Sequence, residues 1–236
     1  MKKNTIIAFE GLDCSFKETN YKTFLRHLKD MRLKPGFNIY SESFPRYGNW
    51  ACKHVEKWLD GTFDRSMLKA HPKAVDSLYS LDRFAYWYEA NGEGHRRIER
   101  LDDTSAFNYF VFDRYNLSNT IYNPIHPGEV HIEDFTFDRD IYGIPNPDVI
   151  VWMRMRDFDV LPDLLYKKEN KDQNELDIEF LRGVWERSEE IIHSAIFKHL
   201  GINLVVVDCL NEDGTIKTRE ELSNFIWKSV CASIKY

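Results

Sequence analysis

One stretch of the chain, "GLDCSFKETN" at residues 11–20, nearly matches the loop with which many proteins bind nucleotide phosphates. The Walker A pattern, G-x-x-x-x-G-K-[ST], is met at Gly11 and Lys17. Phe16 stands where the pattern has its second glycine, and the hydroxyl that follows the lysine is delayed to Thr19. In such a loop, backbone N–H groups at the start of a helix bind phosphate, and the lysine contacts the outer phosphates. The stretch therefore predicts a phosphate-binding loop, whose shape depends on Phe16 because a glycine there commonly has dihedral angles that are costly for a side chain.

Three further stretches carry side chains suited to a phosphorylated substrate. Arg46, in "SFPRYG", suits a bidentate contact with a phosphate group, although a solvated arginine in a proline turn has the same pattern. Tyr79 and Arg83 are four residues apart, hence on one face of a predicted helix, where they suit a nucleobase; a packed ring beside a surface arginine is the alternative. Asp113 and Arg114 end a predicted strand, where they suit Mg²⁺ and phosphate, or form a structural ion pair.

A polar segment at residues 166–177 contains Lys167, Lys168 and Lys171. It lies between two predicted helices. It predicts either a lid that brings cations to transferring phosphates or a solvated loop, and its composition fits both.

Short apolar runs alternate with helical patterns along the chain. Strands are predicted at 5–9, 37–41, 109–113, 148–153 and 203–208, and helices at 17–33, 49–59, 73–90, 157–168, 176–199 and 217–235. The strands are apolar almost throughout, which indicates burial on both faces, as in a parallel sheet. In the third helix, the residues predicted to face the core are Leu78, Leu81, Ala85 and Tyr88. The alternation predicts a doubly wound α/β fold, in which ligands bind beyond the carboxyl ends of the strands.

The composition restricts the class of protein. The chain has 236 residues, 43% of them hydrophobic, enough for one compact domain with a sizeable core. Its net charge of −6 argues against a protein that coats nucleic acid. No apolar run approaches the roughly 18 residues of a membrane span, no signal-peptide pattern is present, and the four cysteines lack metal-knuckle spacing. We therefore expect a cytoplasmic protein with no nucleic-acid or membrane partner.

In combination, these stretches resemble thymidylate kinase, a P-loop nucleoside monophosphate kinase. The segments that carry the resemblance follow the family's order from residue 9 to about residue 184: "FEGLD…K", "FPRYG", "LYSLDRFAY", "DRYNLSNTIY", "GIPNPDVIVWM" and "NKDQNELDIEFLRGV". The resemblance implies a single P-loop kinase domain over residues 1–236, with a five-stranded parallel sheet flanked by helices and a short lid at about 166–177. It also implies a homodimer in the cytoplasm, or in the host cytoplasm if the chain is phage-encoded.

The implied reaction is phosphoryl transfer from ATP, with Mg²⁺, to a pyrimidine deoxynucleoside monophosphate, and above all from ATP to dTMP. The catalytic residues would be Lys17, Asp13, Asp113 and Arg114, with Thr19 and Asp113 on the metal. The ATP phosphates would be bound by Gly11, Cys14, Ser15, Phe16, Lys17, Glu18, Thr19, Lys167, Lys168 and Lys171. The acceptor would be bound by Asp13, Phe44, Arg46, Tyr79, Arg83, Arg114, Ser118, Asn119 and Tyr122. Within that set, Arg83 would reach the pyrimidine O4 and Tyr122 would crowd the sugar.

Departures from the family pattern lie on the donor side. Phe16 and Cys14 replace glycines, Glu18 replaces the usual serine or threonine, and Gln173 stands where arginine is frequent. The sequence therefore supports recognition of the acceptor more strongly than catalysis with the donor. Two alternatives follow: a non-catalytic nucleotide-binding or regulatory protein, and a deoxynucleoside kinase. Arg46 argues against the second, because it suits an acceptor that already carries a phosphate.

Overall fold

The computed structural model describes residues 4–31, 36–64, 66, 70–89, 94–102, 105–122, 131–167 and 177–234. Its sheet has five parallel strands in the order β2-β3-β1-β4-β5. The strands are β1 (Asn4–Gly11), β2 (Phe37–Ser43), β3 (Phe107–Asp113), β4 (Val149–Arg154) and β5 (Asn203–Asp208). All five strands predicted from the apolar runs are confirmed.

The centre of the sheet is apolar on both faces. β1 pairs with both neighbours at Ile7, which is opposite Val111 of β3 and Val149 of β4, and all three side chains are buried. Farther along the same register, Phe9 is opposite Asp113. The carboxyl ends of β1 and β3 are therefore neighbours, and the loop that follows β1 begins next to Asp113.

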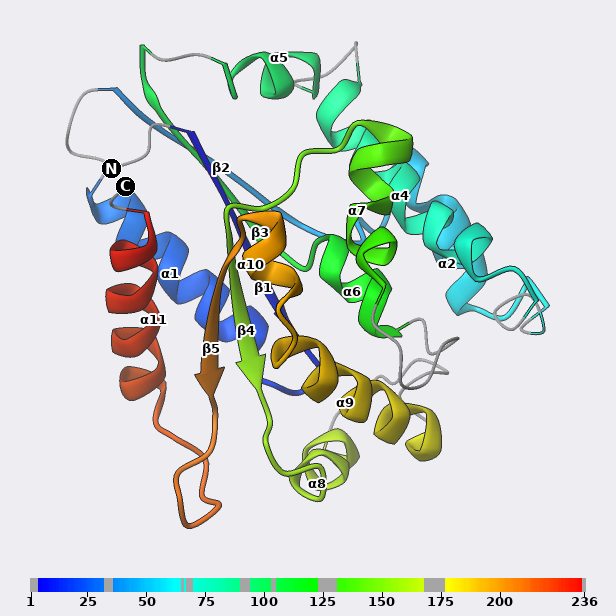
Figure 1. Ribbon diagram of the computed structural model, residues 1–236, viewed down its shortest axis with the longest axis vertical. Helices are drawn as coiled ribbons and strands as arrows, with labels where there is room; N and C mark the ends of the chain where they lie inside the picture. The colour runs from blue at the N-terminus through cyan, green and yellow to red at the C-terminus, as the bar shows by residue number, and fades with distance from the viewer. Residues whose placement is uncertain are drawn as a thin grey trace.

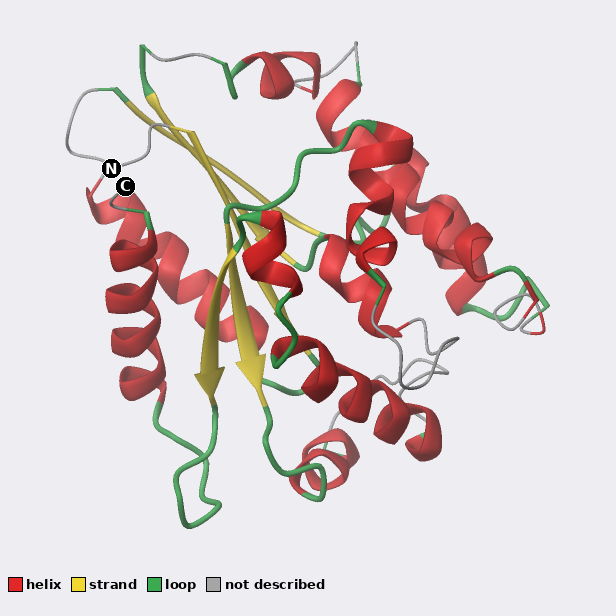
Figure 2. Cartoon of the chain, in the orientation of Figure 1, coloured by secondary structure: helices red, strands yellow, loops and turns green. Residues whose placement is uncertain are grey.

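Helices cover both faces of the sheet, as Figure 1 shows. α1 (Lys17–Met31) and α11 (Arg219–Ser233) contact each other on one face, α1 against β3 and α11 against β5. The remaining helices are η1 (Trp50–Cys52), α2 (Lys53–Leu59), α4 (Pro72–Tyr88), α5 (Gly94–Glu99), α6 (Asn116–Tyr122), α7 (Ile132–Tyr142), α8 (Val160–Tyr166), α9 (Ile178–Ile192) and α10 (Ile196–Leu200). Figure 2 shows how loops at the ends of the strands connect these layers. Within the described ranges, no helix is both long enough and apolar enough to cross a membrane.

The helix ends follow from local sequence chemistry. α11 begins at a capping box in which the Thr218 side chain accepts a hydrogen bond from the Glu221 N–H and the Glu221 carboxylate accepts one from Thr218. α7 and α10 end at Gly143 and Gly201, which have φ angles of 67° and 68°. Glycine takes this left-handed conformation without a steric penalty, so it is the usual residue after a helix.

Three helical predictions differ from the structure. The pattern at 176–199 contains two helices, α9 and α10, because the Ser194 hydroxyl and N–H both donate to the Ile191 carbonyl and end the first of them. The pattern at 49–59 begins with the 3₁₀ turn η1. Helices α5, α6 and α7 were not expected, and in α7 the alternating Phe135 and Phe137 are more typical of a strand.

The expected apolar stripe of α4 is confirmed at Ala85, which is buried, and in part at Tyr88, which is half-buried and packs against the core. It is wrong at Leu81, which is 40% exposed, and Leu78 is only partly buried. The buried face instead carries charges, among them Asp82 and Arg83. Charged side chains tolerate such burial only when each has a partner, and the partners come from distant parts of the chain.

Candidate functional site

A cavity of about 510 Å³ lies beyond the carboxyl ends of β1, β2 and β3, the edge at which a doubly wound sheet binds its ligands. Its wall brings together many of the predicted site residues: Asp13, Lys17, Glu18, Phe44, Tyr79, Arg83, Asp113, Arg114, Ser118, Asn119 and Tyr122. It also contains residues that were not predicted: Ser43, Pro45, Tyr47, Trp58, Leu59, Val75, Asp76, Tyr115 and Phe180. Most of these additions are apolar or aromatic side chains, which carry no chemical signal in a sequence.

The loop after β1 has a left-handed backbone conformation at two residues that are not glycine. Phe16 has a φ angle of 59° and Cys14 one of 61°, both in the left-handed region. Gly11 is needed for a different reason, since a Cβ on it would lie 2.6 Å from Ser15 Oγ and 2.9 Å from the Met153 carbonyl oxygen. The left-handed dihedral angles expected at this position of the loop are thus present, although the residue is phenylalanine instead of glycine.

Lys17 begins α1, and its side chain reaches Asp113 at the end of β3. Its Nζ lies 3.1 Å from Asp113 Oδ1, and both side chains are largely buried. Burial lowers the pKa of Lys17, and the charge of Arg114 lowers it further, whereas Asp113 and Asp13 raise it. The lysine is therefore fixed at the cavity wall by a carboxylate.

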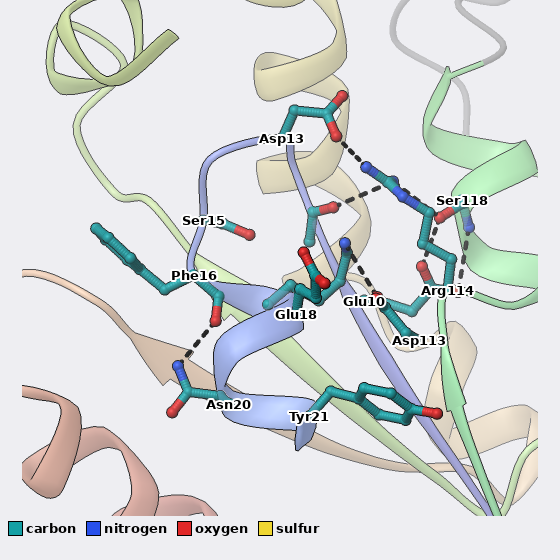
Figure 3. A network of polar contacts seen from close by, with 12 residues as sticks. Glu10, Asp13, Ser15, Phe16, Glu18, Asn20, Tyr21, Asp113, Arg114 and Ser118 are labelled. Atoms are coloured by element: carbon teal, nitrogen blue, oxygen red, sulfur yellow. Dashed lines mark hydrogen bonds and ion pairs between the residues drawn. The ribbon is translucent and has the colours of Figure 1, made fainter. Parts of the chain in front are cut away.

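Arg114 is the centre of a polar network over this loop. Its own backbone is in the left-handed region, with φ of 62°. Nη2 donates to the Asp13 carboxylate, while Nη1 lies 3.4 Å from both the Gly11 carbonyl and Ser118 Oγ. The Tyr122 hydroxyl donates to Asp13 Oδ2 at 3.0 Å, and the guanidinium lies over the Tyr122 ring. Figure 3 shows Arg114 between Asp13 and Ser118, so α6 and the loop after β1 are held in one arrangement.

Glu10, the last side chain of β1 before Gly11, binds Ser118 of this network and was not predicted as a site residue. It is fully buried and accepts hydrogen bonds from Tyr115 N at 2.8 Å, Ser118 Oγ at 2.6 Å and Ser118 N at 3.3 Å. Burial raises the pKa of Glu10, and the hydrogen bond from Ser118 opposes that effect. A carboxylate at the end of an otherwise apolar strand was the available signal.

On the α4 side, Tyr79 and Arg83 both lie on the cavity wall, as their spacing predicted. Arg83 is buried and forms an ion pair with Asp138 of α7. Nothing in the sequence around Arg83 indicates that partner, which is 55 residues away.

Arg46 lies beside the cavity but is not among the residues of its wall. Its Nε donates to Asp82 Oδ1 at 2.8 Å, its Nη2 to the Asp82 carbonyl at 2.9 Å, and its backbone N–H to Asp82 Oδ2 at 2.8 Å. These bonds use two of the five guanidinium N–H groups. The prediction that Arg46 binds an acceptor phosphate stays a prediction.

The donor residues are placed less completely. Gly11, Cys14, Ser15, Phe16 and Thr19 belong to the loop or to the start of α1 but not to the cavity wall. Lys167 is exposed at the end of α8. Lys168, Lys171 and Gln173, and with them most of the predicted lid, lie outside the described residues.

The residues on the cavity wall fit Mg²⁺ bound together with a nucleotide. Among the described residues, no group of three His, Cys, Asp or Glu side chains is arranged to hold a metal by itself. Mg²⁺ in phosphoryl-transfer sites is usually held by one or two carboxylates with phosphate oxygens and water. Asp113 and Glu18 supply carboxylates on the wall, whereas Thr19 is exposed and off the wall.

By sequence, the chain matches no protein-family model and no curated protein. By structure, it is similar to thymidylate kinase from Candida albicans, with a TM-score of 0.61 and 18% sequence identity over 98% of this chain and 92% of that one. At that identity the similarity concerns the fold, an α/β architecture with a five-stranded parallel sheet flanked by helices, as in P-loop kinases.

Proposed function

We propose that this chain is a nucleoside monophosphate kinase that transfers a phosphoryl group from ATP to a pyrimidine deoxynucleoside monophosphate, with dTMP as the acceptor. One observation carries the proposal: a single cavity joins the lysine of the near-Walker loop, the Asp113–Arg114 pair and the Tyr79–Arg83 face of α4. These are a phosphate-binding end and a base-binding end in one space.

At the base-binding end, the Tyr79 ring stacks on the pyrimidine and Arg83 donates a hydrogen bond to it. Ser118 and Asn119 border the same space with Phe44, and Tyr122 lies beside the sugar. Stacking on a ring and hydrogen bonding to a side chain are both typical of ligand pockets, which combine apolar walls with a few polar groups that fix the orientation of the ligand.

At the phosphate-binding end, phosphoryl transfer requires positioning and neutralisation of charge. Lys17 contacts the donor phosphates, and backbone N–H groups at the start of α1 bind them. Arg114, held by Asp13, faces the acceptor phosphate. Mg²⁺, when bound with ATP, would neutralise phosphate charge. Asp113 would hold it together with Glu18 on the cavity wall, and Thr19 would contribute only from outside the wall.

Beyond the cavity, the segment 166–177 serves as a lid that excludes water, and Lys167, Lys168 and Lys171 supply its charge. We also propose that residues 1–236 act as one domain in the cytoplasm. A homodimer would cover the apolar outer face of α4, where Leu81 is 40% and Phe84 39% exposed.

A coupled assay of ADP release tests this proposal with dTMP, dUMP, dCMP, dGMP and thymidine as acceptors. We expect turnover with dTMP and none with thymidine. Lys17→Ala should abolish turnover while dTMP binding, measured by calorimetry, changes little. Turnover with thymidine alone would establish a nucleoside kinase, and binding of dTMP without ATP or ADP binding would establish a regulatory protein.

A further inference from the structure

The arginine at the base-binding end of the cavity is held by a set of buried contacts. Arg83 Nε donates to Asp138 Oδ2 at 2.5 Å, and Nη2 donates to Asp138 Oδ1 at 3.2 Å. The two side chains are 2% and 3% exposed. The Ser80 hydroxyl donates to the same Oδ1 at 2.5 Å, which fixes the carboxylate in turn.

This pairing determines which part of the guanidinium is left for a ligand. Asp138 occupies the edge formed by Nε and Nη2, Nη2 also lies 3.4 Å from Ser80 Oγ, and Nη1 donates to the Tyr115 carbonyl at 3.5 Å. The second N–H of Nη1 therefore remains for a molecule in the cavity, whose wall includes Arg83 and Tyr115. A guanidinium has N–H donors and no acceptor, so this N–H can be satisfied only by an acceptor atom.

We infer that Asp138 is a positioning residue for base selection: it fixes Arg83 so that the cavity accepts a pyrimidine with a carbonyl at C4 and rejects one with an amino group there. The inference rests on the proposed function. It assigns a role to a residue that does not itself line the cavity. The ligand class is a 4-oxopyrimidine nucleotide, such as one of thymine or uracil, as opposed to cytosine.

The carboxylate is needed because it presents acceptors to both nitrogens of the Arg83 edge. An amide at position 138 would keep one acceptor but would place an NH₂ group opposite Nε or Nη2. Two donors would then face each other in a buried space, which is unfavourable, and the guanidinium would turn. Its Nη1 end would no longer be directed by the protein.

The variant that tests the inference is Asp138→Asn, with Asp134→Asn as the matched control. Asp134 lies one turn earlier on α7, and its carboxylate pairs with Lys73 and Arg187 instead of Arg83. For each protein, kcat and KM are measured for dTMP and dCMP at saturating ATP, together with the thermal midpoint. A purely structural carboxylate would lower the midpoint without changing the ratio of the two acceptors.

We expect the wild type to prefer dTMP. Asp138→Asn should reduce the dTMP/dCMP ratio of kcat/KM by roughly 10-fold or more, the effect of losing a hydrogen bond to a charged group, and mainly through the KM for dTMP. The KM for ATP should not change. Asp134→Asn should leave the ratio unaltered.

Ser80→Ala keeps the ion pair and removes the hydroxyl that contacts both Asp138 Oδ1 and, at 3.4 Å, Arg83 Nη2, so it serves if Asp138→Asn does not fold. It should shift the ratio in the same direction by roughly 2- to 10-fold. An unaltered ratio in a folded Asp138→Asn or Ser80→Ala protein overturns the inference, as does a wild type that prefers dCMP. An unaltered ratio leaves the kinase proposal standing, whereas a preference for dCMP leaves the kinase activity standing and replaces dTMP as the acceptor. A wild type that binds no nucleoside monophosphate refutes the kinase proposal and the inference with it.

Discussion

Phe16 offers a direct test of the backbone shape of the loop after β1. Its φ angle of 59° lies in the left-handed region, where a residue with a Cβ is less stable by about 1–2 kcal/mol than in its usual conformation. Phe16→Ala keeps that penalty, whereas Phe16→Gly removes it. Both variants lose the same packing of the ring against the core, so their difference isolates the backbone.

The expected size of that difference follows from two opposing effects. Relief of the left-handed strain favours the glycine variant by about 1–2 kcal/mol, and the greater freedom of glycine in the unfolded chain disfavours it by about 0.4–1 kcal/mol. Phe16→Gly should therefore be more stable than Phe16→Ala by about 0.8 kcal/mol, with limits of about 0 and 1.6 kcal/mol. For a chain of this length, the middle value corresponds to roughly 2–3 °C in Tm.

Thermal and urea unfolding of the two variants provide the measurement, with Glu18→Ala and Glu18→Gly as the control pair. Glu18 lies in the first turn of α1, where alanine should be the more stable of the two by about 0.5–1 kcal/mol. The sign should thus reverse between positions 16 and 18. If alanine is the more stable residue at both, the left-handed assignment of Phe16 is wrong. We also expect Phe16→Gly to gain no turnover, because the loop already has the conformation that glycine would allow; a gain would mean that Phe16 has impaired the loop.

Three further predictions concern the cavity. Arg46→Ala should raise the KM for the monophosphate by roughly 10- to 150-fold more than the KM for ATP. It should also lower the free energy of unfolding by about 3–5 kcal/mol, because Asp82 stays buried without its cation. Equal KM changes for both substrates would exclude a phosphate-binding role for Arg46. Tyr122→Ala should narrow the preference for dTMP over its ribonucleotide, measured as a ratio of kcat/KM, and an unaltered ratio in a folded variant would remove Tyr122 from sugar discrimination. Burial raises the pKa of Glu10 above its ordinary value of 4.5. The wild type should therefore lose stability relative to Glu10→Gln as the pH rises from about 4.5 through the raised pKa. If the two proteins differ in free energy of unfolding by the same amount over that whole pH range, the burial argument is wrong.

The sheet was predictable because its strands are apolar almost without interruption. The run at 109–113, for example, is buried completely between two neighbouring strands and the helical layers. The loop between β1 and α1, with Lys17 at the start of the helix, was predictable from Gly11 and Lys17 because its pattern is local in sequence; its binding of phosphate stays a prediction. The Tyr79–Arg83 pair was predictable for the same reason, because four residues of a helix fix their relation.

The remaining parts of the site depend on pairs that are distant in sequence. In the sequence, Asp138 and Asp82 cannot be told from other acidic residues. Only the fold brings Asp138 to Arg83 and Asp82 to Arg46. The apolar stripe predicted for α4 is wrong at Leu81 for this reason, because hydrophobic spacing assigns charged positions such as Asp82 and Arg83 to the surface. Glu10 shows the same limit, since nothing near it in the sequence indicates that Tyr115 and Ser118, more than 100 residues away, will supply its hydrogen-bond donors.

Asp82 and Arg83 are adjacent in the chain, yet each is neutralised by a different distant segment, Asp82 by Arg46 and Arg83 by Asp138. This arrangement constrains how the sequence can diverge. A substitution at one of the four positions leaves a buried charge alone, so positions 46 and 82 should covary among relatives, and positions 83 and 138 should form a second, independent pair. An insertion or deletion within α4 between its start and these two residues would turn both away from their partners at once, since each added residue rotates the helix by about 100°. Relatives should therefore vary freely in the connections around α4 while the length of the helix up to this dipeptide remains the same.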